Sequence, residues 1–251
     1  NEGKKIIDAV KLTDNPFKIR NDLQLNATYN LPSVNGEVNV MYTINSKGEI
    51  LVSTKLTGIE SDLPILPRFG NNLIIDNSYD KVEWYGRGEH ENYQDRNTSA
   101  LVGAYNANVA DLYFEYIRPQ ENGNRTDVRW TALMDSKQNG LLIASTSQKG
   151  MSFSALHMPN EDFDISDDLD YSNKNTTANF SKHTIDIKEQ DLVQLNIDLA
   201  QRGLGGDDSW GSKPQIKYQL KSNKKYSYSF YLMPFKNGSV KNFVNMHQQV
   251  K

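Results

Sequence analysis

The sequence contains no cysteine among its 251 residues. This absence excludes disulfide bonds, thiol nucleophiles and thiolate metal ligands. It does not fix the cellular compartment, because many exported proteins also lack cysteine. Long apolar runs are missing too, since no stretch approaches the roughly 20 apolar residues that a membrane span needs. The chain opens Asn1-Glu2-Gly3 without methionine or an apolar signal region, so we interpret it as a fragment or a processed chain.

An excess of charge of either sign is also absent. The formal net charge is −3, the isoelectric point is near 5.9, and lysine and arginine form no stripe along the chain. This balance argues against a nucleic-acid partner. The content of 37% hydrophobic and 24% charged residues is that of an ordinary globular protein. The length allows one large β domain or two smaller ones.

Apolar and polar residues alternate with a period of two in many segments, which is the signal of half-buried strands. The clearest examples are residues 50–57, 192–199 and 226–232. Further candidates are residues 37–44, 68–75, 81–84, 112–118, 126–134, 141–146, 151–157, 184–187 and 214–220. Turn pairs such as Asn35-Gly36 and Asn139-Gly140 separate them. We therefore predict an all-β, antiparallel sandwich or barrel, with one short helix at residues 96–105.

Two regions depart from this rhythm. Residues 1–36 carry few strand signals and are expected to form an irregular or partial-strand segment before the domain at 37–236, which a tail at 237–251 follows. Residues 159–182 form an acidic insertion. The spacing of Asp162, Asp164, Ser166 and Asp168 resembles a calcium loop, but its sixth position would be Asp167 rather than glycine and its twelfth would be Asn173 rather than glutamate. We favour a solvated loop over a calcium site.

The loop from about residue 200 to residue 213 contains Gly205-Gly206-Asp207-Asp208-Ser209-Trp210-Gly211. Loops of this length are uncommon in compact β domains and tend to be functional. Its four glycines allow sharp bends. An exposed Trp210 costs hydrophobic free energy unless something covers it. Its flat indole suits the apolar C–H face of a pyranose ring, so a platform for sugar or for another domain is favoured over packing against its own sheet.

Asp207 and Asp208 are poorly placed to act as a catalytic pair. Glycoside hydrolysis needs two carboxyl groups roughly 5 to 10 Å apart that flank one bond. Adjacent residues in an extended chain point to opposite sides. We therefore expect these aspartates to accept hydrogen bonds from loop N–H groups, or alternatively, with Ser209, to contact sugar hydroxyls.

A second dense cluster spans residues 86–96 and includes His90, Glu91, Asn92 and Arg96. Glu91 or His90 could act as an acid or base. We favour a structural interpretation, in which Arg96 binds a carboxylate in bidentate fashion at a strand-to-helix crossover. The four histidines show no metal-binding spacing, and no Gly-x-Ser-x-Gly elbow is present.

The order of these motifs is similar to that of a known family. The series consists of Trp84-Tyr85-Gly86-Arg87-Gly88, Glu91-Asn92-Tyr93-Gln94-Asp95-Arg96, Tyr116-Ile117-Arg118-Pro119-Gln120-Glu121-Asn122-Gly123, Asn196-Ile197-Asp198 and the loop ending in Trp210. From about residue 38 to residue 235 it closely resembles the C-terminal "small chain" domain of bacterial β-galactosidases of glycoside hydrolase family 2. It departs from the family at Glu89, where proline is usual, so the local backbone is expected to differ. The family's initial strands are not recognisable.

The resemblance implies a large antiparallel supersandwich of the galactose mutarotase type. It also implies that the catalytic carboxylates lie in a separate (β/α)-barrel domain of the same polypeptide, so no catalytic residue is assigned to this chain. Trp210 would reach that barrel and stack on a β-galactoside. The family's catalytic domain commonly uses Mg and Na, and we expect no cofactor in this chain. The compartment stays open between the bacterial cytoplasm and periplasm.

Three other functions remain as hypotheses. The chain could be a stand-alone carbohydrate-binding module, a mutarotase-like epimerase that uses Glu and His, or a structural element at a homo-oligomer interface. Fold kinship alone supports the epimerase.

Overall fold

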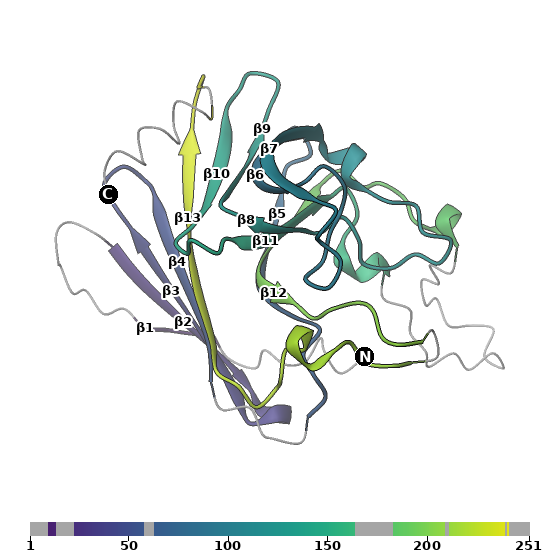
Figure 1. Ribbon diagram of the computed structural model, residues 1–251. Helices are drawn as coiled ribbons and strands as arrows, with labels where there is room; N and C mark the ends of the chain where they lie inside the picture. Colours follow the sequence, from purple (N-terminus) through teal and green to yellow (C-terminus); the bar gives the residue numbers. More distant parts are fainter. Residues whose placement is uncertain are drawn as a thin grey trace, which may run out of the picture.

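The computed structural model describes residues 10–13, 23–57, 63–163, 183–208, 211–238 and 240. These residues form thirteen β-strands and five short 3-10 helices. All strand pairs are antiparallel, and the strands make two sheets that face each other (Figure 1). The predicted all-β antiparallel sandwich is therefore confirmed.

The larger sheet has the strand order β1-β2-β3-β4-β13-β10-β9-β6-β7. Its strands are β1 (Val10–Thr13), β2 (Leu23–Leu31), β3 (Gly36–Ile44), β4 (Ile50–Thr57), β13 (Tyr226–Phe235), β10 (Gly140–Ser145), β9 (Trp130–Met134), β6 (Lys81–Gly88) and β7 (Leu101–Asn108). The smaller sheet has the order β5-β12-β11-β8, made of β5 (Arg68–Ile75), β12 (Val193–Gln201), β11 (Met151–Leu156) and β8 (Arg125–Val128).

The main core lies between the two sheets. On the larger sheet Val52 pairs with Phe230, and both side chains are buried. Trp84 of β6 reaches across and meets the ring of Phe153 of β11 edge-on at 5.9 Å. These residues belong to one continuous cluster contributed by both sheets. Burial of such large apolar side chains is the main stabilising term for a sandwich.

The strands β11 and β12 of the smaller sheet are buried on both faces, which the alternating pattern did not predict. In β12 the apolar residues face the core, yet Gln194, Asn196 and Asp198 on the opposite face are only 1–3% exposed. Asn196 donates to Ser154 Oγ and to Asn160 Oδ1, both at 3.0 Å. The polar face is therefore covered by hydrogen-bonding loops rather than by water, as buried polar groups require.

Several predicted elements are wrong. Residues 96–105 do not form a helix, because β7 begins at Leu101 and pairs with β6. Residues 112–118 form no strand, since the 3-10 helix η3 (Val109–Leu112) leads into irregular chain. The segments at 184–187 and 214–220 contain the 3-10 helices η5 (Thr184–Asp186) and η6 (Ile216–Tyr218). In each case tertiary pairing or local turns override a short alternating pattern.

Residues 126–134, predicted as a single strand, contribute to both sheets. Asp127 adopts a positive φ of 53°, and the chain leaves β8 in the smaller sheet and enters β9 in the larger one. Arg129 lies at the crossing: its N–H donates to the Tyr85 carbonyl at 2.8 Å, and its carbonyl accepts from the Ser145 N–H at 2.8 Å. The hydrophobic pattern continues across this crossing because both strands share one core.

The regions outside 37–236 differ in how much of them is described. Within residues 1–36, β1 pairs with β2, and β2 pairs with β3 along its whole length, from Leu23↔Ile44 to Leu31↔Gly36. The acidic insertion is described only at its start, where η4 (Asn160–Phe163) lies. Its Asp164, Ser166 and Asp168 lie outside the described residues, as does most of the tail, although Val240 packs against a second small apolar cluster that includes Met233 and Phe235.

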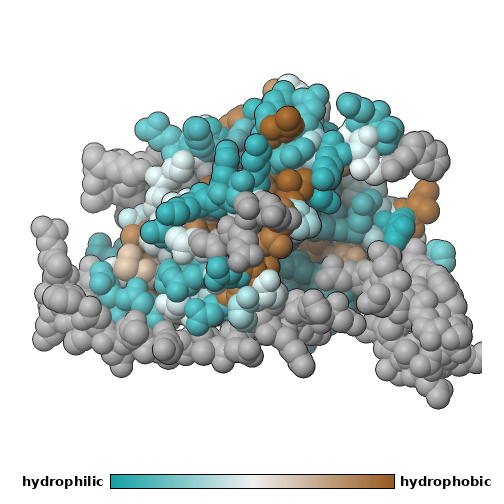
Figure 2. All heavy atoms as spheres, turned by 90° about the horizontal axis from the view of Figure 1, so that it is seen from below, coloured by the Kyte–Doolittle hydropathy of each residue, from teal (hydrophilic) through white to brown (hydrophobic). Residues whose placement is uncertain are grey.

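Hydrophilic residues cover most of the coloured surface in Figure 2, and the hydrophobic ones are scattered among them. The most exposed large apolar side chains of the described residues come from separate elements: Ile117, Ile185, Ile216 and Leu101. Single exposed apolar residues of this kind are common in folded proteins. In the described part of the chain, no helix is long and apolar enough to cross a membrane.

Candidate functional site

The described part of the glycine-rich loop lies at the end of β12. Ser209 and Trp210 lie outside the described residues, so the role predicted for Trp210 stays a prediction. Asp207 and Asp208 are exposed. Both arms of the loop are described on either side of this gap, from Gly203 to Asp208 and from Gly211 onward. The neck of the loop can therefore be described even though its tip cannot.

Close backbone contacts shape the neck, which we define as Gly203–Gly206 together with Ser212. The Gly203 N–H donates to the Tyr218 carbonyl at 2.8 Å. A Cβ atom added to Gly206 would lie 2.2 Å from the Ser212 carbonyl oxygen, so the two arms touch there. No larger residue fits at position 206 without moving the backbone. The glycines thus serve close approach, and Gly211 additionally has a φ of +105°.

Asp95, from the second sequence cluster, contacts the neck. Its Oδ2 accepts a hydrogen bond from the Gly205 N–H at 2.8 Å. A Cβ atom on Gly203 would lie 2.7 Å from the same oxygen. Its other carboxylate oxygen, Oδ1, is buried and has no hydrogen-bond partner among the described residues. The two clusters that the sequence shows separately are therefore in direct contact.

Glu91 is the centre of a polar network beside Asp95. It accepts hydrogen bonds from the Tyr116 hydroxyl, from Arg96 Nη2 at 2.6 Å and from the Gly123 N–H at 2.8 Å. The Glu91 side chain is 10% exposed and that of Arg96 is 51% exposed. Burial and the adjacent Glu91 carboxylate raise the pKa of Tyr116. Arg96 uses one nitrogen, Nη2, for both Glu91 and Tyr116, so the bidentate geometry expected from the sequence is not observed.

Asn92 is fully buried and hydrogen-bonded through its side chain. Its Oδ1 accepts from the Thr126 N–H at 2.9 Å and from the Thr126 hydroxyl at 2.6 Å, and its Nδ2 donates to the His90 carbonyl at 3.1 Å. This geometry favours the structural interpretation of the cluster. At Glu89, where the resemblance led us to expect a different backbone, the Gly88–Glu89 peptide is cis.

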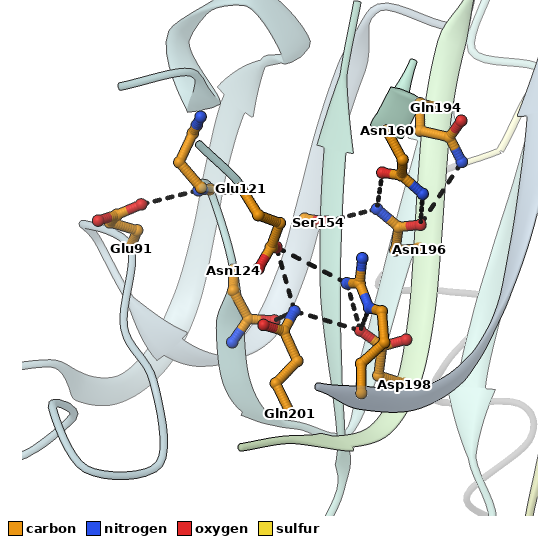
Figure 3. Close-up of polar contacts among 12 residues, drawn as sticks. Glu91, Glu121, Asn124, Ser154, Asn160, Gln194, Asn196, Asp198 and Gln201 are labelled. Carbon is orange, nitrogen blue, oxygen red and sulfur yellow. Dashed lines mark hydrogen bonds and ion pairs between the residues drawn. The ribbon is translucent and has the colours of Figure 1, made fainter. Parts of the chain in front are cut away.

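A second buried charge network, which sequence reasoning did not identify as a site, lies on the polar face of the smaller sheet (Figure 3). Arg68 Nη2 lies 2.6 Å from Asp198 Oδ2 and 3.7 Å from Glu121 Oε1. Gln201 Nε2 donates to Glu121 at 3.1 Å and is 3.3 Å from Asn124 Oδ1. Burial raises the pKa of the Asp198 and Glu121 carboxyl groups, and Arg68 partly offsets this effect.

The sequence contains one sign of this network, a glycine inside a strand at position 70. In the structure Gly70 lies opposite Asp198 in the strand register. A Cβ atom on Gly70 would lie 1.8 Å from an Asp198 carboxylate oxygen, so the glycine makes room for a buried carboxylate. An alternating strand pattern assigns Asp198 to the solvent face instead. Only the covering segments, distant in sequence, reveal that this face is buried.

Two open depressions lie near these networks. One, of about 490 Å³, is lined by charged residues of the Glu91 network and by the aromatic side chains Tyr113, Phe114 and Tyr116. The other, of about 420 Å³, is lined by Gln94, Asp127, Lys149 and Tyr218 among others, and Tyr218 is the residue that holds Gly203. Aromatic and polar side chains together suit a sugar ring. Within the described ranges, no group of three or more acidic or histidine residues could hold a metal ion.

The fold and the loop define an all-β sandwich that carries a glycine-rich, aromatic loop. Residues 4–232 match the family model described as beta galactosidase small chain, and the chain belongs to this family. It is 34% identical over 195 residues to a beta-galactosidase of Priestia megaterium, covering 78% of this chain and 17% of that protein. It is 30% identical over 226 residues to one of Streptococcus thermophilus, covering 89% of this chain and 20% of that protein. The chain thus spans about a fifth or less of these relatives.

Among solved structures, a galactose mutarotase related enzyme from Lactobacillus acidophilus is similar with a TM-score of 0.46 and 9% sequence identity. That match covers 92% of this chain and 72% of the other.

Proposed function

We propose that this chain is the small-chain domain of a β-galactosidase, inactive alone, that completes a galactoside site through the loop carrying Trp210. The observation that supports this most directly is family membership over residues 4–232 together with relatives several times longer than this chain. A chain that is one segment of a longer enzyme can leave the reacting carboxylates to another domain.

The interactions of the acidic residues in these two networks support a non-catalytic role for the chain. Glu91 accepts hydrogen bonds from three donors. Asp198 is buried beside Arg68, and Glu121, whose side chain is 35% exposed, lies near the same guanidinium. Glycoside hydrolysis requires one carboxyl group free to protonate the leaving group and another that faces the sugar. These three carboxylates instead interact with arginine, with the Tyr116 hydroxyl, with the Gln201 amide and, at Glu91, with a backbone N–H.

The first test is an assay of the isolated chain on an aryl galactoside. We expect no turnover above background, and turnover at enzyme-like rates would contradict the proposal. In a second test, this chain replaces the matching segment of the Priestia megaterium relative. We expect the chimera to recover the galactosidase activity that the relative loses when that segment is deleted.

The role of Trp210 can be tested in the same chimera. Trp210→Ala should raise KM for the galactoside by severalfold to about tenfold, since an aromatic contact contributes roughly 0.5–1.5 kcal/mol. Because stacking is made with the bound substrate as well as in the transition state, kcat should change less. Tyr231→Ala is the matched control, since Tyr231 is an aromatic residue that is 39% exposed outside the loop.

A stand-alone carbohydrate-binding module is the second candidate, and the depression lined by Tyr113, Phe114 and Tyr116 favours it. Titration of galactose and lactose into the isolated chain separates the two functions. Millimolar or tighter binding that Phe114→Ala abolishes supports the module. Binding that only Trp210→Ala weakens supports the loop.

A further inference from the structure

The hairpin at residues 93–96 brings the Asp95 carboxylate to the neck of the Trp210 loop. We propose that Asp95 is a positioning residue that fixes the neck and thereby sets the affinity of the loop for sugar. The functional consequence rests on the proposed function, whereas the structural part can be tested without it. Asp95 lies in the cluster whose role the sequence leaves open.

Asp95 is held from the interior of the domain. The Tyr93 N–H donates to the Arg96 carbonyl at 3.2 Å and the Arg96 N–H donates to the Tyr93 carbonyl at 2.8 Å, so Gln94 and Asp95 form the turn of a tight hairpin. The Tyr93 side chain is buried. The Arg96 guanidinium lies 5.2 Å from the Tyr93 ring centroid and pairs with Glu91. These contacts leave the Asp95 backbone little freedom to move.

Glu91 extends this support to the chain beyond the hairpin. The carboxylate that receives Arg96 also accepts the Gly123 N–H. Asn92, next in sequence, binds Thr126 at the start of β8. The Glu91 cluster therefore anchors the hairpin to the smaller sheet. Asp95 in turn joins the hairpin to the loop through its hydrogen bond with Gly205.

The neck is shaped to receive the carboxylate. Added Cβ atoms on Gly203 and Gly205 would lie 2.7 Å and 3.4 Å from Asp95 Oδ2. A side chain at position 203 would therefore occupy the space that the carboxylate fills. The Gly205 N–H donates to the same carboxylate oxygen at 2.8 Å.

The second oxygen of Asp95 also argues for a positional role. Oδ1 is buried without a partner among the described residues, and a desolvated, unpaired carboxylate oxygen destabilises a fold. The hydrogen bond of the other oxygen to Gly205 is made despite this cost, at the point where the neck meets the domain.

The direct test is amide hydrogen exchange at Gly205, followed by NMR in the intact chain. Asp95→Ala should speed exchange at Gly205 by about tenfold or more, as expected for loss of a hydrogen bond to a charged group. Asp95→Asn keeps a weaker acceptor and should give a smaller increase. Asp76→Ala is the matched control, since Asp76 Oδ1 accepts a single backbone hydrogen bond from Ser78 at 2.9 Å in another turn.

Unchanged exchange at Gly205 in a folded Asp95→Ala variant would overturn the proposal. If this variant does not fold, Asp95→Asn decides by the same measurement. In the galactosidase chimera, Asp95→Ala should raise KM severalfold with a smaller change in kcat, in parallel with Trp210→Ala. A KM that responds to Trp210→Ala and not to Asp95→Ala contradicts the positional role. A KM that responds to neither refutes the proposed function, and exchange at Gly205 still decides whether Asp95 is the anchor.

Discussion

Replacement of Arg68 by alanine should destabilise the domain by about 3–5 kcal/mol. Arg68 is the cation beside the buried carboxylate of Asp198, 2.6 Å from its Nη2, and the half-buried carboxylate of Glu121, 3.7 Å away. Removal of one partner of a buried pair leaves an uncompensated buried charge, which costs this amount. The Arg68 side chain is 26% exposed, so the lower end of the range is expected. Urea unfolding, followed by far-UV circular dichroism, measures the loss.

The loss should depend on pH in a defined direction. Burial already raises the pKa of Asp198 and Glu121 in the folded protein above their ordinary values of 3.8 and 4.5. The folded state therefore binds protons more readily than the unfolded state, so these carboxyls lower stability as pH rises from the unfolded-state pKa through the folded-state pKa. Above the folded-state pKa the loss is constant. Without Arg68 the pKa values rise further. The variant should be closer to the parent in stability at pH 4–5 than at pH 7–8.

Arg96→Ala is the control, because Arg96 forms an ion pair with Glu91 and its side chain is 51% exposed. It should cost less than Arg68→Ala, about 1 kcal/mol, because the Glu91 carboxylate that it leaves behind keeps its hydrogen bonds from Tyr116 and from the Gly123 N–H. Addition of Asp198→Asn to the Arg68 variant should recover part of the loss, since a neutral amide needs no cation. Equal losses for Arg68→Ala and Arg96→Ala, or an Arg68→Ala loss that does not vary with pH, would refute the reasoning.

Two further substitutions test the loop and the Glu91 cluster separately. Gly206→Ala places a Cβ atom 2.2 Å from the Ser212 carbonyl oxygen, so it should weaken galactoside binding in the chimera while the urea midpoint of the isolated chain changes little. Gly238→Ala is the comparison variant, because an added Cβ atom there has no neighbour closer than 3.5 Å. Asn92→Ala leaves the buried Thr126 N–H and hydroxyl without their acceptor and should cost about 1–3 kcal/mol in urea unfolding. A stable Asn92→Ala variant would show that the amide is not structural.

Much of the larger sheet can be predicted from alternation, because its outer positions are polar and its inner positions are apolar. The predicted strands at residues 37–44 and 50–57 match β3 and β4 closely. The smaller sheet is harder to predict, since Gln194, Asn196 and Asp198 look like solvent-facing residues until distant loops cover them. The pattern cannot show which segment covers a face.

The candidate site, too, is partly predictable from local patterns and partly set by contacts between distant segments. Motif order identified the family, and the glycines marked a loop of unusual shape. The contact between Asp95 and Gly205 joins residues 110 positions apart, and no local pattern encodes it. The Arg68 network combines residues from β5, β12 and the segment before β8, so it emerges only when the strands pair.

The crossing at Arg129 has a consequence for how the domain unfolds. The chain passes directly from β8 in one sheet to β9 in the other, and Arg129 hydrogen-bonds in the larger sheet on both of its sides. Detachment of β8 from the smaller sheet would therefore strain the backbone hydrogen bonds of Arg129 beside β9 in the larger sheet. A single residue joins β8, at the edge of the smaller sheet, to β9 of the larger sheet, so we expect the two sheets to open as one cooperative unit rather than as two independent foldons.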